Sequence, residues 1–438
     1  MAIERALPCG YARRGEGVRA MRVIMSGGGI GGLTAALALH AAGIEVELHE
    51  ATPDPKALGV GINLLPHAVR ELTELGLGDR VRATGVETAE LLYANRQGEE
   101  IWREDRGLVA GYRWPQVSIH RGELLMLLLD AARERLGDAI RCGSRGVGVS
   151  SDATGATLHL AGGGTARGDA VVAADGIHSA IRAQWFPDEG APRWNGAILW
   201  RATSEHPGFR TGRTMVQAGS SQVKFVCYPI REAKDGRPAL INWIAEERVD
   251  PSGPWAREDW NRRGRIEDFL PLFADWEWPW LSVPSLIRST QTVWEFPMVD
   301  RDPLPRWTHG RATLLGDAAH PMYPIGSNGA SQAILDARAL AFHLARTGEA
   351  EAGLAAYEAE RRPVTGAIVQ ANRGAGPDQV LDLAAARAPD GFGAAGREAV
   401  LPHAELAAIA TGYKRMAGFD PAVLNARPSY SARLAAAG

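Results

Sequence analysis

The chain has 438 residues and a formal net charge of −3, which allows one or two domains with a sizeable core. Its basic residues are dispersed and balanced by acids, so the charge pattern does not favour binding to nucleic acid or to an anionic membrane. No apolar run approaches the roughly 20 residues that a membrane-spanning helix needs. The 3 cysteines lie far apart, which argues against a disulfide framework and a zinc site, so we expect no metal and a reducing, cytoplasmic location.

The first 20 residues differ in composition from the rest of the chain. Residues 1–20 contain four arginines but no continuous apolar segment, so we do not expect a secretory signal. They contribute nothing to the first predicted strand. We therefore expect residues 1–20 to form a disordered extension.

The stretch from residue 21 to residue 51 predicts a buried strand, a glycine-rich turn, an alanine-rich helix and a second strand. Gly27, Gly29 and Gly32 give the turn the pattern Gly-x-Gly-x-x-Gly, and an acid, Glu50, follows about 20 residues later. Glycines let the backbone approach a pyrophosphate, the helix N-terminus attracts its charge, and a carboxylate can accept bonds from ribose hydroxyls. The pattern therefore predicts a dinucleotide site, the alternative being a glycine-rich turn in an ordinary α/β unit.

Two later stretches repeat this arrangement of a buried strand, a sharp turn and a helix. They contain Asp175-Gly176 and Gly316-Asp317, and a Pro/Gly loop after the latter leads to a helix predicted from about Asn328 to Arg346. An acid at a strand end beside a helix N-terminus offers a hydroxyl acceptor next to an anion-stabilising dipole. Taken alone, Asp175-Gly176 could equally be a structural turn.

Residues 195–294 form a different, β-rich part of the chain with many tryptophans. Nine of the 13 tryptophans lie between Trp194 and Trp294. Tryptophan is usually a core residue, but this enrichment also suits a pocket for a planar apolar ligand. The candidate walls of such a pocket are Trp200, Tyr228 and Trp243, and for each of them a core position is the alternative.

In this order, the three motifs resemble those of the single-component FAD-dependent aromatic monooxygenases with the p-hydroxybenzoate hydroxylase fold. Gly27–Gly32 with Glu50 matches the first FAD fingerprint of that family, Asp175-Gly176 matches its Asp-Gly motif, and Gly316-Asp317 matches its Gly-Asp motif. Arg121 falls where the family has an FAD-contacting arginine. The likeness covers residues 21 to about 375. It implies an α/β fold with a Rossmann-like FAD-binding domain of the glutathione-reductase type, a β-sheet substrate domain and C-terminal helices.

The resemblance also implies a domain organisation. We expect a discontinuous FAD-binding domain formed by residues 21–190 and 296–375, with residues 86–118 contributing to the substrate sheet. The substrate domain is expected at residues 191–295. Residues 376–438 are then a C-terminal helical tail.

The activity that the resemblance implies is hydroxylation of an aromatic or heteroaromatic small molecule. NAD(P)H, as NADPH or NADH, reduces a non-covalently bound FAD, and O2 adds to give a C4a-hydroperoxyflavin that transfers one oxygen atom to the ring. Residues 58–63, 118–124, 298–304 and 322–332 are most similar to the phenazine-carboxylate monooxygenases of the family, so a carboxylated, phenazine-like molecule is one candidate substrate. The expected partners are this substrate and O2, without nucleic acid or membrane, and the protein is expected to be a monomer or homodimer.

The residues expected at the FAD follow from the motifs and from the resemblance. The helix beginning near Asn328 should direct backbone N–H groups and a positive dipole end at the flavin edge that becomes anionic on reduction. The full set is Gly27, Gly29, Ile30, Gly31, Gly32, Glu50, Ala51, Gly61, Arg121, Asp175, Gly176, Gly316, Asp317, Pro324, Gly326, Ser327, Asn328 and Gly329. Candidate catalytic residues are Lys224, Tyr228 and Pro324.

Lys224 has two interpretations. Side chains alternate along the strand at 222–229, so Lys224 and Tyr228 share a face. If Tyr228 faces the flavin, Lys224 can pair with a substrate carboxylate or, with a pKa lowered by burial, accept a proton. Because lysine is seldom buried unless it is paired, the alternative is an ordinary surface cation.

Other functions compatible with the motifs remain open. One is a non-catalytic FAD-binding sensor, because a fold alone does not establish an activity. The other is a different FAD oxidoreductase of the same fold, such as an epoxidase or an NAD(P)H oxidase. Substrate-stimulated consumption of NAD(P)H with a hydroxylated product separates the monooxygenase from both.

Overall fold

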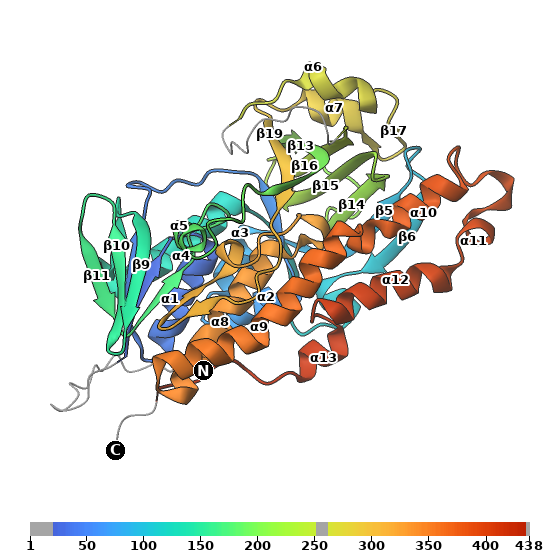
Figure 1. The fold of residues 1–438 in the computed structure, drawn as a ribbon. Helices are drawn as coiled ribbons and strands as arrows, with labels where there is room; N and C mark the ends of the chain where they lie inside the picture. The colour runs from blue at the N-terminus through green and yellow to red at the C-terminus, as the bar shows by residue number, and fades with distance from the viewer. Residues whose placement is uncertain (1–20, 251–261, 435–438) are drawn as a thin grey trace, which may run out of the picture.

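The computed structural model describes residues 21–250 and 262–434, and the extension expected at residues 1–20 lies outside this part. Two large sheets and a set of long C-terminal helices dominate the architecture (Figure 1). Each sheet has its own hydrophobic core. The predicted α/β class with C-terminal helices is confirmed.

The first sheet is mostly parallel and contains the strands that precede the three motifs. Its strand order is β20 (Thr308–His309), β21 (Ala312–Leu314), β12 (Ala170–Ala173), β1 (Arg22–Ser26), β2 (Glu45–Glu50) and β8 (Ile140–Cys142). Only β20 is antiparallel to its neighbour. Because β21, β12 and β1 are adjacent and parallel, the three turns at their carboxyl ends lie at one edge of the sheet.

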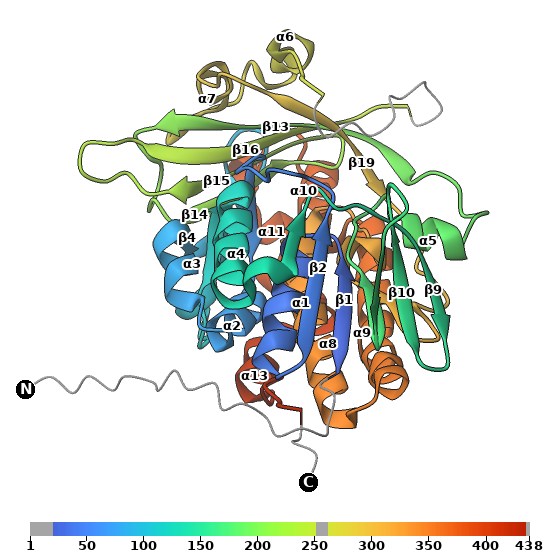
Figure 2. The same cartoon turned by 90° about the vertical axis from the view of Figure 1, so that its left-hand side faces the viewer.

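Both faces of this sheet are covered, which explains why its central strands are continuous apolar runs. One face packs against α1 (Ile30–Ala41) and α8 (Gly329–Thr347), with α9 (Ala350–Arg373) beside α8. Figure 2 shows these helices next to β1 and β2. The other face contacts an antiparallel sheet formed by β9 (Gly146–Asp152), β10 (Gly155–Leu160) and β11 (Thr165–Gly168). The predicted helix from about Asn328 to Arg346 is confirmed as α8.

The second sheet has seven strands and is antiparallel except for one pair, β14 with β5. Its order is β19 (Trp294–Asp300), β13 (Arg193–His206), β16 (Ala239–Arg248), β15 (Val223–Arg231), β14 (Thr214–Gly219), β5 (Glu90–Ala94) and β6 (Glu100–Asp105). One face, here called the outer face, packs against α6 (Ile266–Phe269) and α7 (Val283–Arg288). The opposite, inner face packs against the C-terminal helices.

The remaining elements connect and cover these sheets. A small sheet of β3 (Gly61–Leu64), β7 (Gln116–His120) and β4 (Val86–Thr88) joins the two large ones. The connecting helices are α2 (Pro66–Glu74), α3 (Gly78–Thr84), α4 (Arg121–Leu136) and α5 (Ala180–Trp185), with a two-strand ribbon of β17 (Glu277–Trp278) and β18 (Leu281–Ser282). The C-terminal helices are α10 (Gln379–Arg387), α11 (Arg397–Val400), α12 (His403–Met416) and α13 (Pro421–Ala426).

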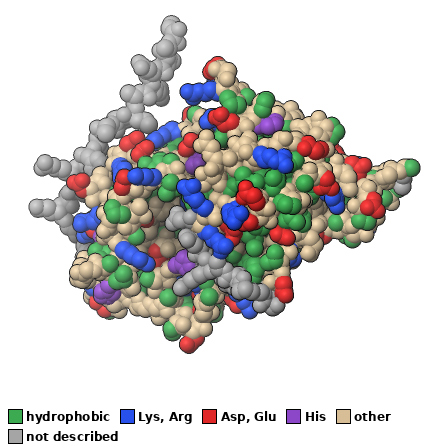
Figure 3. All heavy atoms as spheres, turned by 90° about the horizontal axis from the view of Figure 1, so that it is seen from above, with side chains coloured by type: hydrophobic (Ala, Val, Ile, Leu, Met, Phe, Trp, Pro, Cys, Tyr) green, Lys and Arg blue, Asp and Glu red, His purple; other side chains and the backbone are tan. Residues whose placement is uncertain are grey.

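The molecular surface agrees with the weak charge asymmetry of the sequence. On the face shown in Figure 3, basic and acidic side chains are interspersed around apolar ones. Within residues 21–250 and 262–434, no helix combines the length and apolarity that crossing a membrane requires. The same residues contain no cluster of His, Cys, Asp and Glu suited to a metal ion.

Candidate functional site

The first glycine-rich turn is packed in a way that only glycine allows. Gly27 has φ +104°, and a Cβ there would lie 2.3 Å from the Ala174 carbonyl oxygen. A Cβ on Gly32 would lie 2.0 Å from the Gly27 carbonyl oxygen, so α1 begins directly against the turn. A Cβ on Gly29 would meet nothing within 4 Å. Gly27 and Gly32 therefore shape the turn, while Gly29 leaves open space at the N-terminus of α1, where a pyrophosphate can bind.

Glu50 holds its carboxylate beside this turn. Its Oε2 accepts a hydrogen bond from the Gly28 N–H at 2.6 Å, and its Oε1 accepts one from the Thr52 N–H at 2.7 Å. These bonds fix the carboxylate at the end of β2, as expected for a ribose acceptor. Ala51 follows it and is exposed, whereas Ile30 and Gly31 lie in the first turn of α1, with Ile30 buried.

Asp175-Gly176 lies next to the first turn because β12 pairs with β1. Gly176 has φ +80°, and Asp175 Oδ2 accepts a hydrogen bond from the Ala180 N–H at the start of α5 (3.0 Å). The other oxygen, Oδ1, is buried without a hydrogen-bond partner among the described residues. Burial raises the pKa of this carboxyl. An unsatisfied acceptor at this position fits a hydroxyl group of a bound cofactor.

A buried polar network fixes the turn at Gly316-Asp317. The Gly316 N–H donates to Asp336 Oδ2 at 3.2 Å, and the same carboxylate pairs with His320 and with Arg361. Asp336 and His320 are almost completely buried, whereas Asp317 is exposed. The network thus fixes the turn and leaves the Asp317 carboxylate available to a ligand.

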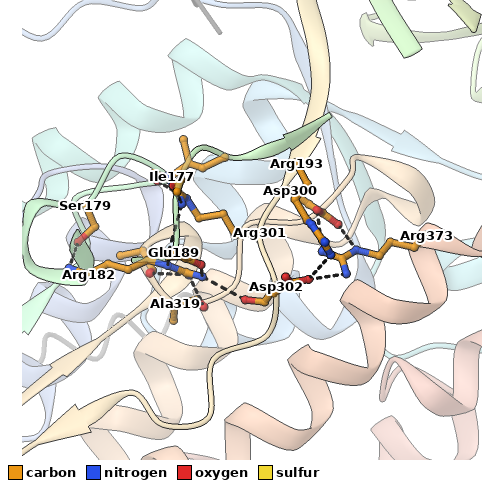
Figure 4. A network of polar contacts seen from close by, with 12 residues as sticks. Ile177, Ser179, Arg182, Glu189, Arg193, Asp300, Arg301, Asp302, Ala319 and Arg373 are labelled. Atoms are coloured by element: carbon orange, nitrogen blue, oxygen red, sulfur yellow. Dashed lines mark hydrogen bonds and ion pairs between the residues drawn. The ribbon is translucent and has the colours of Figure 1, made fainter. Parts of the chain in front are cut away.

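A second network joins Asp175-Gly176 to the segment after Gly316-Asp317 (Figure 4). Arg182 of α5 donates from Nη1 to the carbonyl oxygens of residues 318 and 319, at 3.1 and 2.9 Å. Arg301 donates from Nε to the Ile177 carbonyl oxygen at 3.1 Å, and Glu189 pairs with both arginines. These contacts hold the second and third motifs in a fixed relation to each other.

The loop before α8 contains most of the residues expected at the flavin edge. Pro324 is exposed, and Gly326 and Ser327 have φ values of +69° and +57°. Asn328 is buried and donates from Nδ2 to the Tyr413 hydroxyl at 2.8 Å. α8 then begins at Gly329, so its unpaired backbone N–H groups point into this loop.

Tyr413 shows that α12, part of the predicted tail, is packed directly on this loop. A Cβ on Gly326 would lie 2.2 Å from the Tyr413 hydroxyl oxygen. This hydroxyl also bonds Asn372 Oδ1 at 3.0 Å. No local motif marks α12, so the sequence alone predicts no C-terminal residue at the site.

A polar cluster links Gly61, at the start of β3, to the inner face of the second sheet. The Gly61 N–H donates to Asn242 Oδ1 at 2.7 Å, and Arg201 Nη2 donates to the Gly61 carbonyl oxygen at 2.9 Å. Burial raises the pKa of the Tyr228 phenol to about 12, and the neighbouring Arg201 and Asn242 act against this shift. The phenol is therefore neutral near pH 7 and can donate a hydrogen bond. Sequence reasoning identified Tyr228 but missed Arg201 and Asn242, although strand alternation places all three on one face.

The pocket-wall role of Tyr228 stays a prediction, but it is wrong for Trp200 and Trp243, for which the core alternative is confirmed. Both lie on the outer face, in the core formed with α6 and α7, whereas Tyr228 lies on the inner face. Trp200 stacks on Phe269 with ring centroids 4.8 Å apart, and Trp243 is fully buried. The register explains this result: Trp243 pairs with Cys227 and Asn242 with Tyr228, so adjacent residues point to opposite faces.

Lys224 is not a surface cation, so that alternative is also wrong. It lies on the inner face with 5% of its surface exposed. Its Nζ pairs with Glu246 Oε2 at 2.9 Å and with Asp378 Oδ2 at 3.0 Å. These two carboxylates raise the pKa of Lys224 above its usual value against the opposing effect of burial. The ammonium group is therefore fully matched by protein charges, and it is neither a proton acceptor nor an open partner for a substrate carboxylate.

Arg121 begins α4 and has an exposed side chain. Its aliphatic part lies beside Gly59, in the loop that leads to β3. Although part of the Asp317 side chain reaches solvent, the protein packed around it raises the pKa of its carboxyl, and the charges of His320 and then Arg121 oppose this shift. This position suits an anion contact, but the FAD role of Arg121 stays a prediction.

A cavity lies between the inner face of the second sheet, the loop at Gly326–Ser327 and α12. Its volume is about 20 Å³, which leaves room for little more than one water molecule. Its walls combine apolar and aromatic residues with several polar side chains. The lining residues are Leu65, Leu91, Tyr93, Glu104, Arg106, Gln116, Met215, Gln217, Gly326, Ser327, Pro377, Ala410, Tyr413, Lys414 and Phe419.

Comparison with known proteins agrees with this geometry. The family model described as "FAD binding domain" matches residues 20–192 and 289–372. Phenazine 1,6-dicarboxylic acid hydroxylase PhzS of Lysobacter antibioticus is 49% identical over 80% of this chain and 89% of that protein. Aurachin C monooxygenase/isomerase of Stigmatella aurantiaca is 34% identical over 78% of this chain and 85% of its own length.

A solved structure shares the whole fold. It is Klebsiella pneumoniae HpxO complexed with FAD and uric acid, with a TM-score of 0.68 and 24% identity over 91% of this chain and 92% of that one. With the family match and the sequence relatives, this places the three motifs in a known architecture. The chain belongs to the FAD-binding-domain family and is one of its FAD-dependent aromatic monooxygenases, which use NAD(P)H and O2.

Proposed function

We propose that this protein hydroxylates a carboxylated, planar heteroaromatic compound of the phenazine class. The observation that carries the proposal is the meeting of the three FAD motifs and the loop before α8 at one edge of the first sheet, facing the inner face of the second sheet at Gly61. The relative that is 49% identical is named for a phenazine dicarboxylic acid, which supports the same substrate class. The FAD-binding fold and this relative together favour a flat aromatic acid as the substrate.

The residues that we propose to hold FAD belong to the three motifs and the loop before α8. Gly29 leaves room for the pyrophosphate at the N-terminus of α1, and Glu50 and Asp317 present carboxylates to hydroxyl groups. The unsatisfied Oδ1 of Asp175 offers one more acceptor. When bound, FAD supplies the redox chemistry between NAD(P)H and O2.

The chain's own residues then position the substrate and keep water out. We propose that the N-terminus of α8 stabilises negative charge at the flavin edge through its backbone N–H groups. The buried Tyr228 phenol, neutral near pH 7, orients the Arg201–Asn242 pair beside Gly61. α12 covers the cavity through Tyr413, which excludes solvent from the reacting groups.

The first test is cofactor content and substrate-stimulated turnover. The purified protein is expected to be yellow, with one FAD per chain that is released by denaturation, because no covalent attachment is predicted. A panel of aromatic and heteroaromatic acids should include members that accelerate NAD(P)H consumption and return a hydroxylated product. If no member of the panel accelerates NAD(P)H consumption, the proposed substrate class is wrong and a non-catalytic flavoprotein is favoured.

Asp317→Ala and Glu50→Ala test the carboxylates assigned to FAD. Each variant removes charge-assisted hydrogen bonds to a cofactor hydroxyl, so FAD should bind about 10- to 150-fold more weakly. Flavin fluorescence during titration of the apoprotein measures this affinity. Glu267→Ala, on α6 with its side chain 75% exposed, is the matched control. Unchanged FAD affinity in both site variants would show that the motif assignment is wrong.

Two further expectations belong with this function. A cytoplasmic location suits the cysteines at positions 142 and 227, which are free within the described part of the chain. A monomer or homodimer stays a prediction that light scattering at several protein concentrations can test.

A further inference from the structure

The Tyr413 hydroxyl lies at the centre of a group of buried polar contacts beside the loop before α8. It accepts a hydrogen bond from Asn328 Nδ2 at 2.8 Å and donates one to Asn372 Oδ1 at 3.0 Å. Asn372, in the last turn of α9, donates in turn to the Tyr323 carbonyl oxygen at 3.1 Å. The chain passes from α9 through α10 and α11 and returns along α12 towards α9 (Figure 1), which brings these residues together. The hydroxyl therefore joins both ends of the segment from residue 323 to residue 328.

The middle of this segment has a conformation that only close packing maintains. Ser327 has φ +57°, a left-handed value that costs free energy for a residue other than glycine and persists only where the surroundings impose it. Gly326 lies so close to the Tyr413 ring that a Cβ there would meet the hydroxyl oxygen at 2.2 Å. Tyr413 is 7% exposed, and burial raises the pKa of its phenol, so the hydroxyl keeps its proton near pH 7. It can therefore both accept and donate in the contacts that hold this loop.

The same network continues to the turn at Gly316-Asp317. Asn328 Oδ1 accepts a hydrogen bond from Gln332 Nε2 at 3.1 Å, and Gln332 Oε1 accepts one from Arg361. Arg361 Nε donates to Asp336 Oδ1 at 2.8 Å, and Asp336 holds the Gly316 N–H. The side chains of Asn328, Gln332, Arg361 and Asp336 are at most 4% exposed. One buried network from α8, α9 and α12 thus fixes the whole loop between the third motif and α8.

The orientation of this loop determines where the start of α8 points. The first backbone N–H groups of a helix have no partner within the helix, and their effect on negative charge is confined to about the first turn. Hydrogen bonds from these groups weaken steeply when they are misaligned. Donors that are fixed before the reaction stabilise developing charge best. A small movement of the loop therefore changes how strongly α8 stabilises an anionic flavin edge.

We propose that Tyr413 is a positioning residue that, through Asn328 and Asn372, holds the loop at residues 323–328 and the start of α8 in the orientation that stabilises reduced FAD. The inference rests on the part of the proposed function that places this loop at the flavin edge, and it adds the C-terminal side chain that fixes the loop. Tyr413 acts through the loop and does not have to touch the flavin.

The test uses Tyr413→Phe, which removes the hydroxyl and keeps the ring that packs on Gly326. Tyr112→Phe is the matched control, because Tyr112 is 5% exposed, belongs to the same apolar cluster, and donates its hydroxyl to the Phe419 carbonyl oxygen. Both variants should lower the Tm of the apoprotein. Only Tyr413→Phe should speed hydrogen exchange of the backbone amides at residues 325–329 in the apoprotein, by about tenfold or more.

The second measurement is the redox potential of the bound FAD, which a merely structural role would leave unchanged. In Tyr413→Phe the binding of reduced FAD should weaken about tenfold relative to oxidised FAD, which lowers the potential of this two-electron couple by about 30 mV. Asn328→Ser keeps a residue that caps helices well and removes the amide that contacts Tyr413, so it should give a similar fall. It also carries the test if Tyr413→Phe does not fold. The double variant should fall no further than the larger single effect, because both changes break the same contact.

The outcomes separate this inference from the proposed function. A wild-type potential in Tyr413→Phe and Asn328→Ser overturns the positioning role, even if loop exchange is faster, and wild-type hydroxylation of an aromatic acid then leaves the proposed function standing. Additive falls in the double variant overturn the action through Asn328. Lowered potentials in the two variants, with Tyr112→Phe unchanged, support the positioning role. If the wild-type protein meanwhile hydroxylates no aromatic acid, the positioning role is kept and the proposed function is overturned.

Discussion

Replacing Lys224 with methionine is expected to destabilise the folded protein by about 3–5 kcal/mol, because it leaves two buried carboxylates without their counter-ion. Glu246 and Asp378 are only 4% and 6% exposed, and the remaining oxygen of Asp378, Oδ1, has no hydrogen-bond partner among the described residues. Asp378 immediately precedes α10, so the loss should also loosen the C-terminal helices from the sheet. Urea denaturation followed by circular dichroism measures the free energy of unfolding.

The sign of the pH dependence makes this prediction specific. In Lys224→Met the penalty comes from two buried carboxylates that face each other without a cation, and protonation at lower pH removes negative charge from such a pair. The penalty relative to wild type should therefore shrink from pH 8 towards pH 5. A variant that also carries Glu246→Gln and Asp378→Asn removes all three charges and should recover most of the loss, since neutral replacement of a buried ion pair is often tolerated. An equal penalty at both pH values, or no rescue, would show that the charges are not the cause.

Gly32→Ala is expected to prevent stable FAD binding and to lower the stability of the apoprotein. The added methyl group would lie 2.0 Å from the Gly27 carbonyl oxygen. The backbone of the turn at Gly27 or of the first turn of α1 therefore has to move. Overpacking of this kind costs about 1–3 kcal/mol or more, and the movement displaces the turn that faces the pyrophosphate. Calorimetry of the apoprotein and titration with FAD measure the two effects.

Gly29→Ala is the informative partner of this variant. Nothing lies within 4 Å of its added Cβ, and its backbone has φ −71°, which alanine accepts. The apoprotein should therefore keep its Tm, while FAD binds more weakly because the methyl group enters the space left for the pyrophosphate. Gly412→Ala, in α12 with open space around it, should change neither quantity by much. A Gly29→Ala variant with wild-type FAD affinity would contradict the placement of the pyrophosphate.

The sequence alone predicts those elements of the fold that short local patterns mark. A strand, a glycine turn and a helix follow one another in each motif, so the turns at Gly27, Asp175 and Gly316 could be located without a structure. The loop and helix after Gly316 were also predictable, because glycines, a proline and an apolar repeat mark them. These local patterns therefore locate the predicted FAD-binding turns along the chain.

The rest of the site depends on contacts between distant segments. Lys224 meets Asp378 across 154 positions, and Asn328 meets Tyr413 across 85. Strand alternation predicts which residues share a face, but it does not say which face α6 and α7 cover. For that reason the sequence alone does not decide between a pocket wall and a core position for Trp200 and Trp243, and it does not identify Arg201 as a partner of Gly61.

The proposed function is tested most directly by measuring whether an oxygen atom of the product comes from O2. FAD-loaded protein is given NAD(P)H and phenazine-1-carboxylate under an atmosphere of heavy-isotope O2, and the product is analysed by mass spectrometry. A monooxygenase of the proposed specificity is expected to return a hydroxylated phenazine that carries one heavy oxygen atom, formed in step with NAD(P)H consumption. Consumption of NAD(P)H that yields only hydrogen peroxide, with the phenazine unchanged, would contradict the proposed function and identify the protein as an oxidase towards this compound.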